Sequence, residues 1–237
     1  IIFFWIGLGG VLASTLYPLF AGIFPDLSLA SPESSPLGYF LLNHVGFLTL
    51  LAGIALVSYR ILPDRPGSLL RDTHPPRISR ALRSAGIWLV LLAGASLLMS
   101  PHAVFSFTPR DFVIFLPAVL MLSPLQALAE ELLFRGYLRR WSLHHRRLSS
   151  PWVLCPLSGI LFTLVHLGNP ELTHPEGRAY ILLYYLTYGA VLMYITIQDR
   201  GIEAAAGIHG ANNIFALLVL GYDRLCFPPL PSGMPEN

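Results

Sequence analysis

The stretch DFVIFLPAVLMLSPLQALAEELLFRGYLRR, residues 111–140, decides how the rest of the chain is interpreted. After Asp111 it runs for 18 residues without a charge, which is long enough to cross a bilayer as a helix. Glu130, Glu131 and Arg135 then follow within six positions. One Asp, Lys or Arg at the centre of a membrane helix costs about 2.5 to 3.5 kcal/mol, so such residues are candidates for function.

The composition of the whole chain also indicates a membrane protein. Of its 237 residues, 54% are hydrophobic and only 12% are charged, and the mean hydropathy is +0.61. Soluble domains carry about twice that share of charge. The chain has only two cysteines, Cys155 and Cys226, which indicates neither a disulfide framework nor a thiolate zinc site. We therefore expect lipids as neighbours, and no nucleic acid as a partner.

Seven apolar segments are close to the length of about 20 residues that a membrane-spanning helix needs. The sequence thus predicts an all-α fold, a polytopic membrane helical bundle that forms a single domain over residues 1–237. The expected spans are 1–24, 37–62, 83–100, 111–138, 152–168, 179–198 and 202–221.

The basic residues, all of them arginine, predict how the bundle is oriented. Six lie in residues 60–83 and four in residues 139–147, and the positive-inside rule places both segments in the cytoplasm. Residues 25–36 and 168–177 are rich in turn-forming residues and contain most of the loop acids, so we interpret them as external loops. Seven crossings with the N-terminus inside and the C-terminus outside satisfy all four assignments.

The two adjacent glutamates have different expected roles. Glu131 and Arg135 are four residues apart with the acid first, which is the favoured order for an ion pair within a helix. Glu130 points about 100° away from that pair. Glu130 is therefore left without a partner of its own and is the carboxylate available for proton transfer, whereas Glu131 and Arg135 form a structural clamp at the membrane interface that reaches water.

Two histidines and an asparagine fall at a depth similar to that of Glu130. At 1.5 Å per residue, Glu130 lies roughly 14 Å from Arg139, His166 some 20 Å into its span, and His209 and Asn213 about 10 and 16 Å into the last span. The spacing of four residues puts Phe162 beneath His166. It also puts Asn213 on the face of His209, where both can donate hydrogen bonds to one developing oxyanion. A buried histidine can equally be a purely structural link between helices, which is how we interpret His44.

These residues form three ordered motifs that resemble a known family. EELLFR (130–135), FTLVH (162–166) and HGANN (209–213) are similar to the motifs EExxxR, FxxxH and HxxxN of the CPBP family, the CAAX-processing and bacteriocin-processing intramembrane proteases. The part that contains the motifs covers residues 111–221. The resemblance implies a helical membrane bundle with a cavity that admits a peptide, and no metal or other cofactor.

The resemblance also implies roles for individual residues. Glu130 and His166 would activate a water, and His209 and Asn213 would stabilise the oxyanion. Glu131 and Arg135 would hold the site together, with Phe162 of the second motif in a supporting position. The substrate would be a membrane-associated protein or peptide, which can carry a C-terminal processing or sorting signal, and the expected location is a prokaryotic plasma membrane.

Three other functions are compatible with the same residues. Two carboxylates and two imidazoles could bind zinc in an intramembrane metalloprotease, although no HExxH motif is present. Glu130 and His166 could instead relay protons in a transporter, although the halves of the chain show no inverted repeat. A scaffold without catalytic activity is the third alternative.

Overall fold

The computed structural model describes residues 36–60, 69–70, 75–99, 109–143, 149–173, 175 and 177–219. The elements of this part are all helices, in agreement with the predicted all-α fold. They are α2 (Pro36–Arg60), α3 (Ile78–Met99), α4 (Pro109–Glu131), the π-helix η2 (Leu132–Tyr137), α5 (Leu138–Ser142), α6 (Pro151–Val165), the short 3-10 helix η3 (Pro170–Leu172), α7 (Arg178–Asp199) and α8 (Glu203–Leu218).

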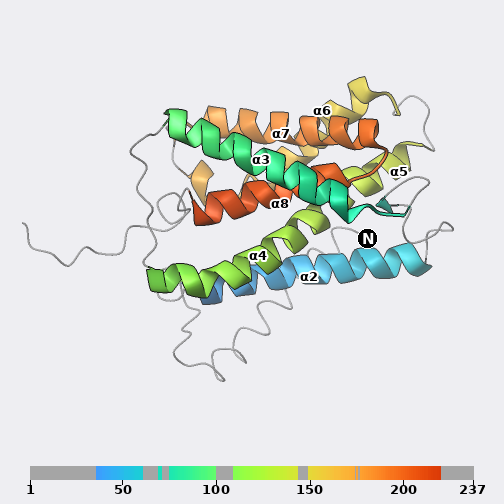
Figure 1. Cartoon of the computed structure of the whole chain (residues 1–237). Coiled ribbons are helices and arrows are strands. Elements are labelled where there is room, and N and C mark those ends of the chain that lie inside the picture. Colours follow the sequence, from blue (N-terminus) through green and yellow to red (C-terminus); the bar gives the residue numbers. More distant parts are fainter. Residues whose placement is uncertain are drawn as a thin grey trace, which may run out of the picture.

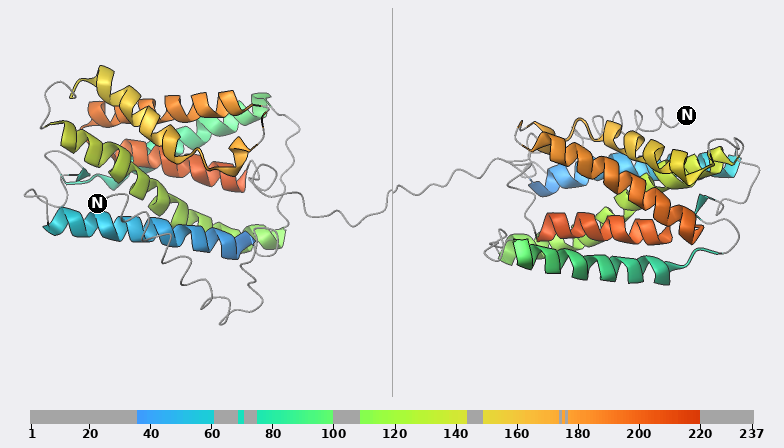
Figure 2. Two further views of the ribbon diagram at one scale, coloured as in Figure 1. Left: turned by 180° about the vertical axis from the view of Figure 1, so that it is seen from behind. Right: turned by 90° about the horizontal axis from the view of Figure 1, so that it is seen from above.

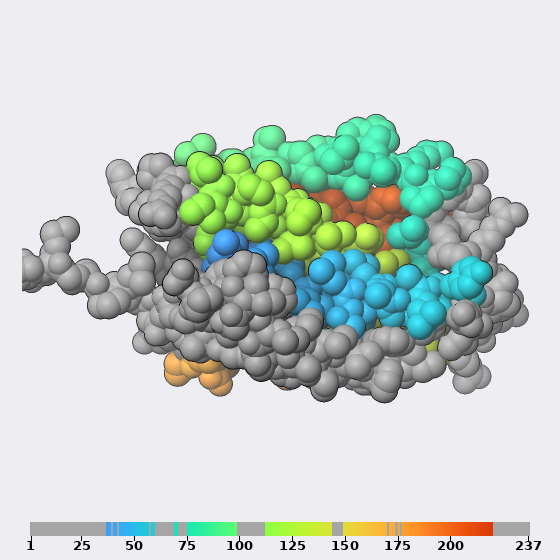
Figure 3. All heavy atoms as spheres, turned by 90° about the horizontal axis from the view of Figure 1, so that it is seen from below, coloured from blue at the N-terminus to red at the C-terminus, as the bar shows by residue number. Residues whose placement is uncertain are grey.

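Helix α8 lies at the centre of the bundle. It packs against α3, α4 and α7, while α6 packs along α7 and α2 packs along α4 (Figures 1 and 2). In the space-filling view of Figure 3, α8 shows only as a narrow strip next to α3 and α4. The helix that contains HGANN is therefore surrounded by the other helices, which puts its polar residues inside the protein.

Glycines allow the helices to approach closely. A Cβ atom on Gly189 of α7 would lie 2.8 Å from the Gly159 Cα of α6 and 2.9 Å from the Phe162 Cβ. On α8, a Cβ atom on Gly207 would collide with the carbonyl oxygen of Ala81 in α3. Small residues at helix contacts let backbones come together in membranes. Gly207 therefore lets α8 pack closely against α3.

Three helical segments of the described part are long and apolar enough to cross a membrane: Ile78–Leu98, Phe112–Ser142 and Arg178–Asp199. Two shorter apolar segments, Asn43–Leu56 and Pro151–Val165, correspond to the second and fifth predicted spans. The described α8 has 16 residues, or about 24 Å at 1.5 Å per residue. The predicted first span, 1–24, lies outside the described residues, so the count of seven stays a prediction.

Several predicted span boundaries differ from the helix ends that the structure shows, and two of these differences involve charged or candidate site residues. Helix α3 begins at Ile78 rather than at residue 83, so that Arg80 and Arg83 belong to the helix. Long arginine stems can lie along apolar surface while the charge reaches water, so these residues do not end a membrane helix. Helix α6 ends at Val165, three residues earlier than predicted, and His166 is its C-cap residue.

Candidate active site

The segment that contains the EELLFR motif changes its helical form in the middle of the motif. Helix α4 ends at Glu131 and continues as the π-helix Leu132–Tyr137, a form that is rare and frequently marks functional sites. The Ser158 hydroxyl of α6 donates a hydrogen bond of 3.3 Å to the Phe134 carbonyl of this turn. The backbone of the motif is thereby held against α6, which carries Phe162 and ends at His166.

The ion pair predicted between Glu131 and Arg135 is present. Arg135 Nη1 donates to Glu131 Oε1 at 2.9 Å, and both side chains are fully buried. Arg135 Nη2 also donates to the Gly189 carbonyl at 3.3 Å, and its guanidinium lies 4.7 Å from the centre of the Phe162 ring. The clamp is therefore not an interfacial pair that reaches water, because Arg135 links η2 to α6 and α7 inside the protein.

Glu131 has a second partner that the helical spacing could not reveal. His209 Nδ1 of α8 lies 2.8 Å from Glu131 Oε1, the oxygen that also accepts from Arg135. His209 is 3% exposed, and the edge of its ring packs against Phe162 and Tyr188. Glu131 therefore orients the histidine of the third motif in addition to binding Arg135.

Glu130 faces both histidines. Its Oε2 atom lies 3.8 Å from His166 Nε2 and 3.8 Å from His209 Nε2. These distances are too long for direct hydrogen bonds and leave space for a bridging water. Glu130 is 5% exposed. The structure thus brings together three of the four residues that the sequence analysis named as catalytic.

The other oxygen of Glu130 has a partner, which corrects the expectation that this residue is left over. Gln126, one turn earlier on α4, donates from Nε2 to Glu130 Oε1 at 3.1 Å. The amide thereby holds Oε1, and Oε2 is the oxygen that lies 3.8 Å from each histidine. The spacing of four residues between Gln126 and Glu130 was visible in the sequence. A single glutamine in an apolar run, however, gave no reason to predict it as the partner of Glu130.

His166 is oriented by its own helix. Its Nδ1 atom lies 2.6 Å from the Phe162 carbonyl, and the two rings are 4.2 Å apart between centroids. Because a carbonyl only accepts hydrogen bonds, Nδ1 carries the proton and Nε2 has a free lone pair in the neutral ring. The predicted position of Phe162 beneath His166 is therefore confirmed, even though His166 itself lies just past the end of α6.

Of the four predicted catalytic residues, Asn213 has the weakest geometric support. It lies one turn beyond His209 on α8 and is half-buried, but no hydrogen bond in the described part joins it to Glu130 or His166. Its neighbour Asn212 has clear cross-helix contacts instead. Asn212 Oδ1 accepts from Trp88 Nε1 of α3 at 3.4 Å and from the Tyr184 hydroxyl of α7 at 3.3 Å.

An aromatic and acidic group beside His166 was missed by the sequence analysis. The Tyr185 ring of α7 lies 4.6 Å from the His166 ring, and its hydroxyl donates to Glu171. Asn169 donates to both Glu171 and Tyr185 at 3.0 Å. Glu171 is 9% exposed, so it is not the solvated loop acid that its position in residues 168–177 suggested.

A further tyrosine of α7 contacts the other histidine. The Tyr188 ring packs edge-on against the His209 ring, with 5.7 Å between centroids. Its hydroxyl is buried and has no hydrogen-bond partner among the described residues. The signal in the sequence was YYLTY, residues 184–188, whose hydroxyls are unusual in the middle of an apolar helix.

The described residues contain no group of three His, Cys, Asp or Glu side chains arranged to hold a metal ion. What the site offers is a pair of buried carboxylates, one guanidinium and two imidazoles inside a helical bundle. Such a set can transfer protons to and from a reacting group, and it can stabilise negative charge that develops there.

Comparison with known proteins agrees with this chemistry. Residues 112–215 match the family described as "Type II CAAX prenyl endopeptidase Rce1-like". The chain is also 30% identical over 205 residues to the uncharacterized protein YyaK of Bacillus subtilis (strain 168), an alignment that covers 84% of this chain and 67% of that protein. No solved structure matches significantly.

The fold and the matched region define an integral membrane protein of the CAAX-type endopeptidase class. The chain belongs to the CPBP family, the CAAX-processing and bacteriocin-processing intramembrane proteases. The resemblance based on its three motifs is therefore confirmed. Membership implies a protein or peptide as the substrate and a membrane as the setting.

Proposed function

We propose that this protein is an intramembrane endopeptidase that hydrolyses a peptide bond with a water activated by Glu130 and His166. The observation that carries the proposal is the position of Glu130 Oε2, which is 3.8 Å from His166 Nε2 and 3.8 Å from His209 Nε2. A water at this point would be held by the carboxylate and the imidazole together. Both atoms accept hydrogen bonds, so each takes one of the two hydrogens of the water.

The hydrolysis then balances without any further reactant. The water oxygen bonds to the carbonyl carbon of the substrate, and its proton passes to the base formed by Glu130 and His166. The carbonyl oxygen becomes negative in the resulting intermediate. The C–N bond breaks as the base returns the proton to the amide nitrogen, which leaves as an amine. General acid-base catalysis of this kind contributes about 10² to 10⁴-fold to the rate.

His209 and Asn213 would stabilise the oxyanion. Because Nδ1 of His209 is committed to Glu131, its Nε2 donates to substrate only when the ring is an imidazolium. Asn213 would supply the second donor from one turn further along α8.

The substrate we propose is a membrane-associated protein or peptide, processed near a C-terminal signal. We further propose that residues 1–237 form one integral-membrane domain with seven spans, the N-terminus in the cytoplasm and the C-terminus outside, in a prokaryotic plasma membrane. In this topology successive helices cross the membrane in opposite directions, and contacts near Arg80, Asp199 and Glu203 support that arrangement. Arg80 pairs with Asp199, and Glu203 accepts from the Arg77 backbone, so these ends of α3, α7 and α8 lie together.

The test compares peptide termini in membrane fractions, by mass spectrometry, between cells that carry the wild-type protein or Glu130→Gln at equal expression. Specific termini should disappear with Glu130→Gln, and the missing termini name the substrate. Glu203→Gln is the matched control, because it makes the same change at another buried glutamate, whose carboxylate accepts a hydrogen bond from the Arg77 backbone at the start of α3. Full cleavage by Glu130→Gln would remove Glu130 from the mechanism.

A chelator separates this proposal from a zinc peptidase. Under the proposed mechanism, cleavage by the purified protein continues after treatment with a chelator. Loss of cleavage that is restored by added zinc would instead assign the reaction to a metalloprotease. Proton-dependent uptake of a solute into liposomes, together with unchanged peptide termini, would assign Glu130 and His166 to transport.

A further inference from the structure

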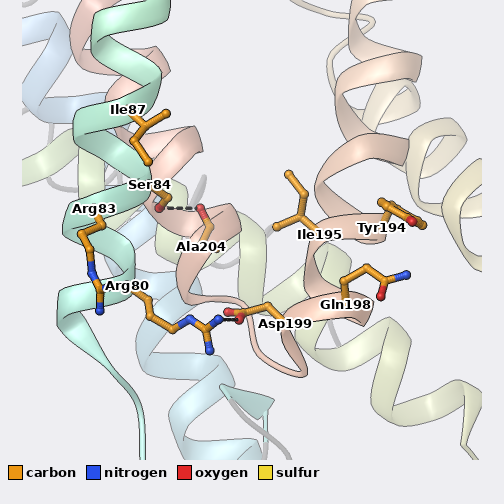
Figure 4. Close-up of a pocket in the computed structure, with 9 residues that line it drawn as sticks. All are labelled: Arg80, Arg83, Ser84, Ile87, Tyr194, Ile195, Gln198, Asp199 and Ala204. Carbon is orange, nitrogen blue, oxygen red and sulfur yellow. Dashed lines mark hydrogen bonds and ion pairs between the residues drawn. The ribbon is translucent and has the colours of Figure 1, made fainter.

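A groove lies between α3 and α7, away from the site described above. Its volume is about 500 Å³, and its lining includes Arg80, Arg83 and Ile87 of α3 together with Tyr194 and Asp199 of α7. Ala204 of α8 also lines it. None of the residues proposed for catalysis contributes to its walls. Figure 4 shows the charged side chains at one end of the groove and Ile87 and Ile195 further along it.

The charged end of the groove has an excess of positive charge. Arg80 Nη2 pairs with Asp199 Oδ1 at 2.6 Å across the groove, which neutralises both side chains. Arg83 is exposed, and its Nε donates to the Ser79 carbonyl at 3.2 Å. No carboxylate of the described residues lies within ion-pair distance of Arg83. Its terminal nitrogens are therefore available to an anion that enters the groove.

The remaining walls are apolar and open to the membrane. Ile87 and Val90 of α3 are 64% and 72% exposed, and Val191 and Tyr194 of α7 are 48% and 52% exposed. Both helices are long and apolar enough to cross a bilayer, so these exposed side chains face lipid tails. The groove thus joins a cationic end to a surface already suited to acyl chains.

The depth of the groove matches the layers of a bilayer. Arg83 lies about 8 Å and Ile87 about 14 Å from the start of α3, at 1.5 Å per residue. The hydrocarbon core is about 30 Å thick, and the headgroup regions add roughly 5 to 8 Å on each side. A helix of 22 residues therefore puts the arginines near the headgroups and Ile87 among the acyl chains.

From these observations we propose that the groove is a binding site for an anionic phospholipid. The phosphate would bind the Arg83 guanidinium, which can donate two parallel hydrogen bonds to it. An acyl chain would run along Ile87 and Tyr194 toward the middle of the membrane. Basic pockets between membrane helices bind anionic headgroups in this way. The inference is independent of the proposed peptidase activity, because the groove and the catalytic residues share no side chain.

The test measures lipid retained by the purified protein. Wild-type protein in detergent is incubated with phosphatidylglycerol or with phosphatidylcholine of the same chain length, and bound lipid is counted by native mass spectrometry. We expect at least fivefold more phosphatidylglycerol than phosphatidylcholine on the wild type. In Arg83→Gln the excess should disappear, and in Arg83→Lys, which keeps the charge, part of it should remain.

Arg200→Asn is the matched control. Arg200 is exposed at the same end of α7 but does not line the groove, and its backbone has a φ of 53°, a conformation that Asn adopts readily. This variant loses the same charge and should keep the excess of phosphatidylglycerol. An equal loss of bound phosphatidylglycerol in Arg83→Gln and Arg200→Asn would show that diffuse surface charge, and not the groove, attracts the lipid. An unchanged excess of phosphatidylglycerol in Arg83→Gln would also overturn the proposal. Equal unfolding temperatures establish that all variants are folded.

Discussion

The substitution Glu131→Gln is expected to destabilise the protein strongly, although it changes only one atom. Glu131 and Arg135 are both fully buried, and Glu131 Oε1 accepts from Arg135 at 2.9 Å and contacts His209 at 2.8 Å. Removing one partner of a buried ion pair typically costs about 3 to 5 kcal/mol. In Glu131→Gln the guanidinium would keep the Gly189 carbonyl as an acceptor but would lose its compensating charge.

A second substitution tests this reasoning directly. Arg135→Met removes the charge that Glu131→Gln leaves unpaired, and it retains a long apolar stem against Phe162. The free energies of unfolding of the wild type, the two single variants and the double variant form a cycle, measured by denaturant titration in detergent. We expect the double variant to be more stable than the sum of the two single losses predicts.

Two results would contradict the assignment of this pair as a buried clamp. The first is a loss of less than about 1 kcal/mol in Glu131→Gln, which is the value for a surface ion pair. The second is strict additivity in the cycle, since it would mean that the two side chains do not interact. The size of the loss matters because folded proteins are stable by only about 5 to 15 kcal/mol.

Three further predictions follow from the site. Asn213→Ala should slow turnover at least a hundredfold with unchanged substrate binding, since one oxyanion donor is worth about 2.7 to 4 kcal/mol. If steady-state kinetics show a tenfold loss or less, Asn213 has a structural role instead. Tyr188→Phe should leave the unfolding free energy unchanged or higher, because the hydroxyl has no described partner; a clear loss in denaturant titration would reveal one. Gly189→Ala should weaken the packing of α6 against α7 and lower the unfolding temperature, because the new methyl would lie 2.8 Å from the Gly159 Cα. An unfolding temperature equal to that of the wild type would contradict this, since it would show that the two helices can move apart without cost.

The sequence alone was sufficient to predict the fold class and to single out residues that the structure brings together, while their catalytic roles stay a prediction. In a membrane, an apolar run of this length can pair its backbone N–H and C=O groups only by forming a helix, so the all-α fold class follows from hydropathy. Charges inside such runs are costly, which singled out Glu130, Glu131 and Arg135. Spacing along one helix also predicts local geometry, and the pairs Glu131–Arg135 and Phe162–His166 both lie as four-residue spacing requires.

Only the tertiary structure decided which groups from different helices meet. The contact of His209 with Glu131 joins residues 78 positions apart, and periodicity carries no information about such a pair. Glu171 and Tyr185 come together because η3 folds back against α7, so a residue assigned to an external loop is buried against the tyrosine that contacts His166. The groove between α3 and α7 likewise depends on how both helices pack on α8. Helical periodicity determines the face that a side chain occupies, whereas packing determines what that face meets.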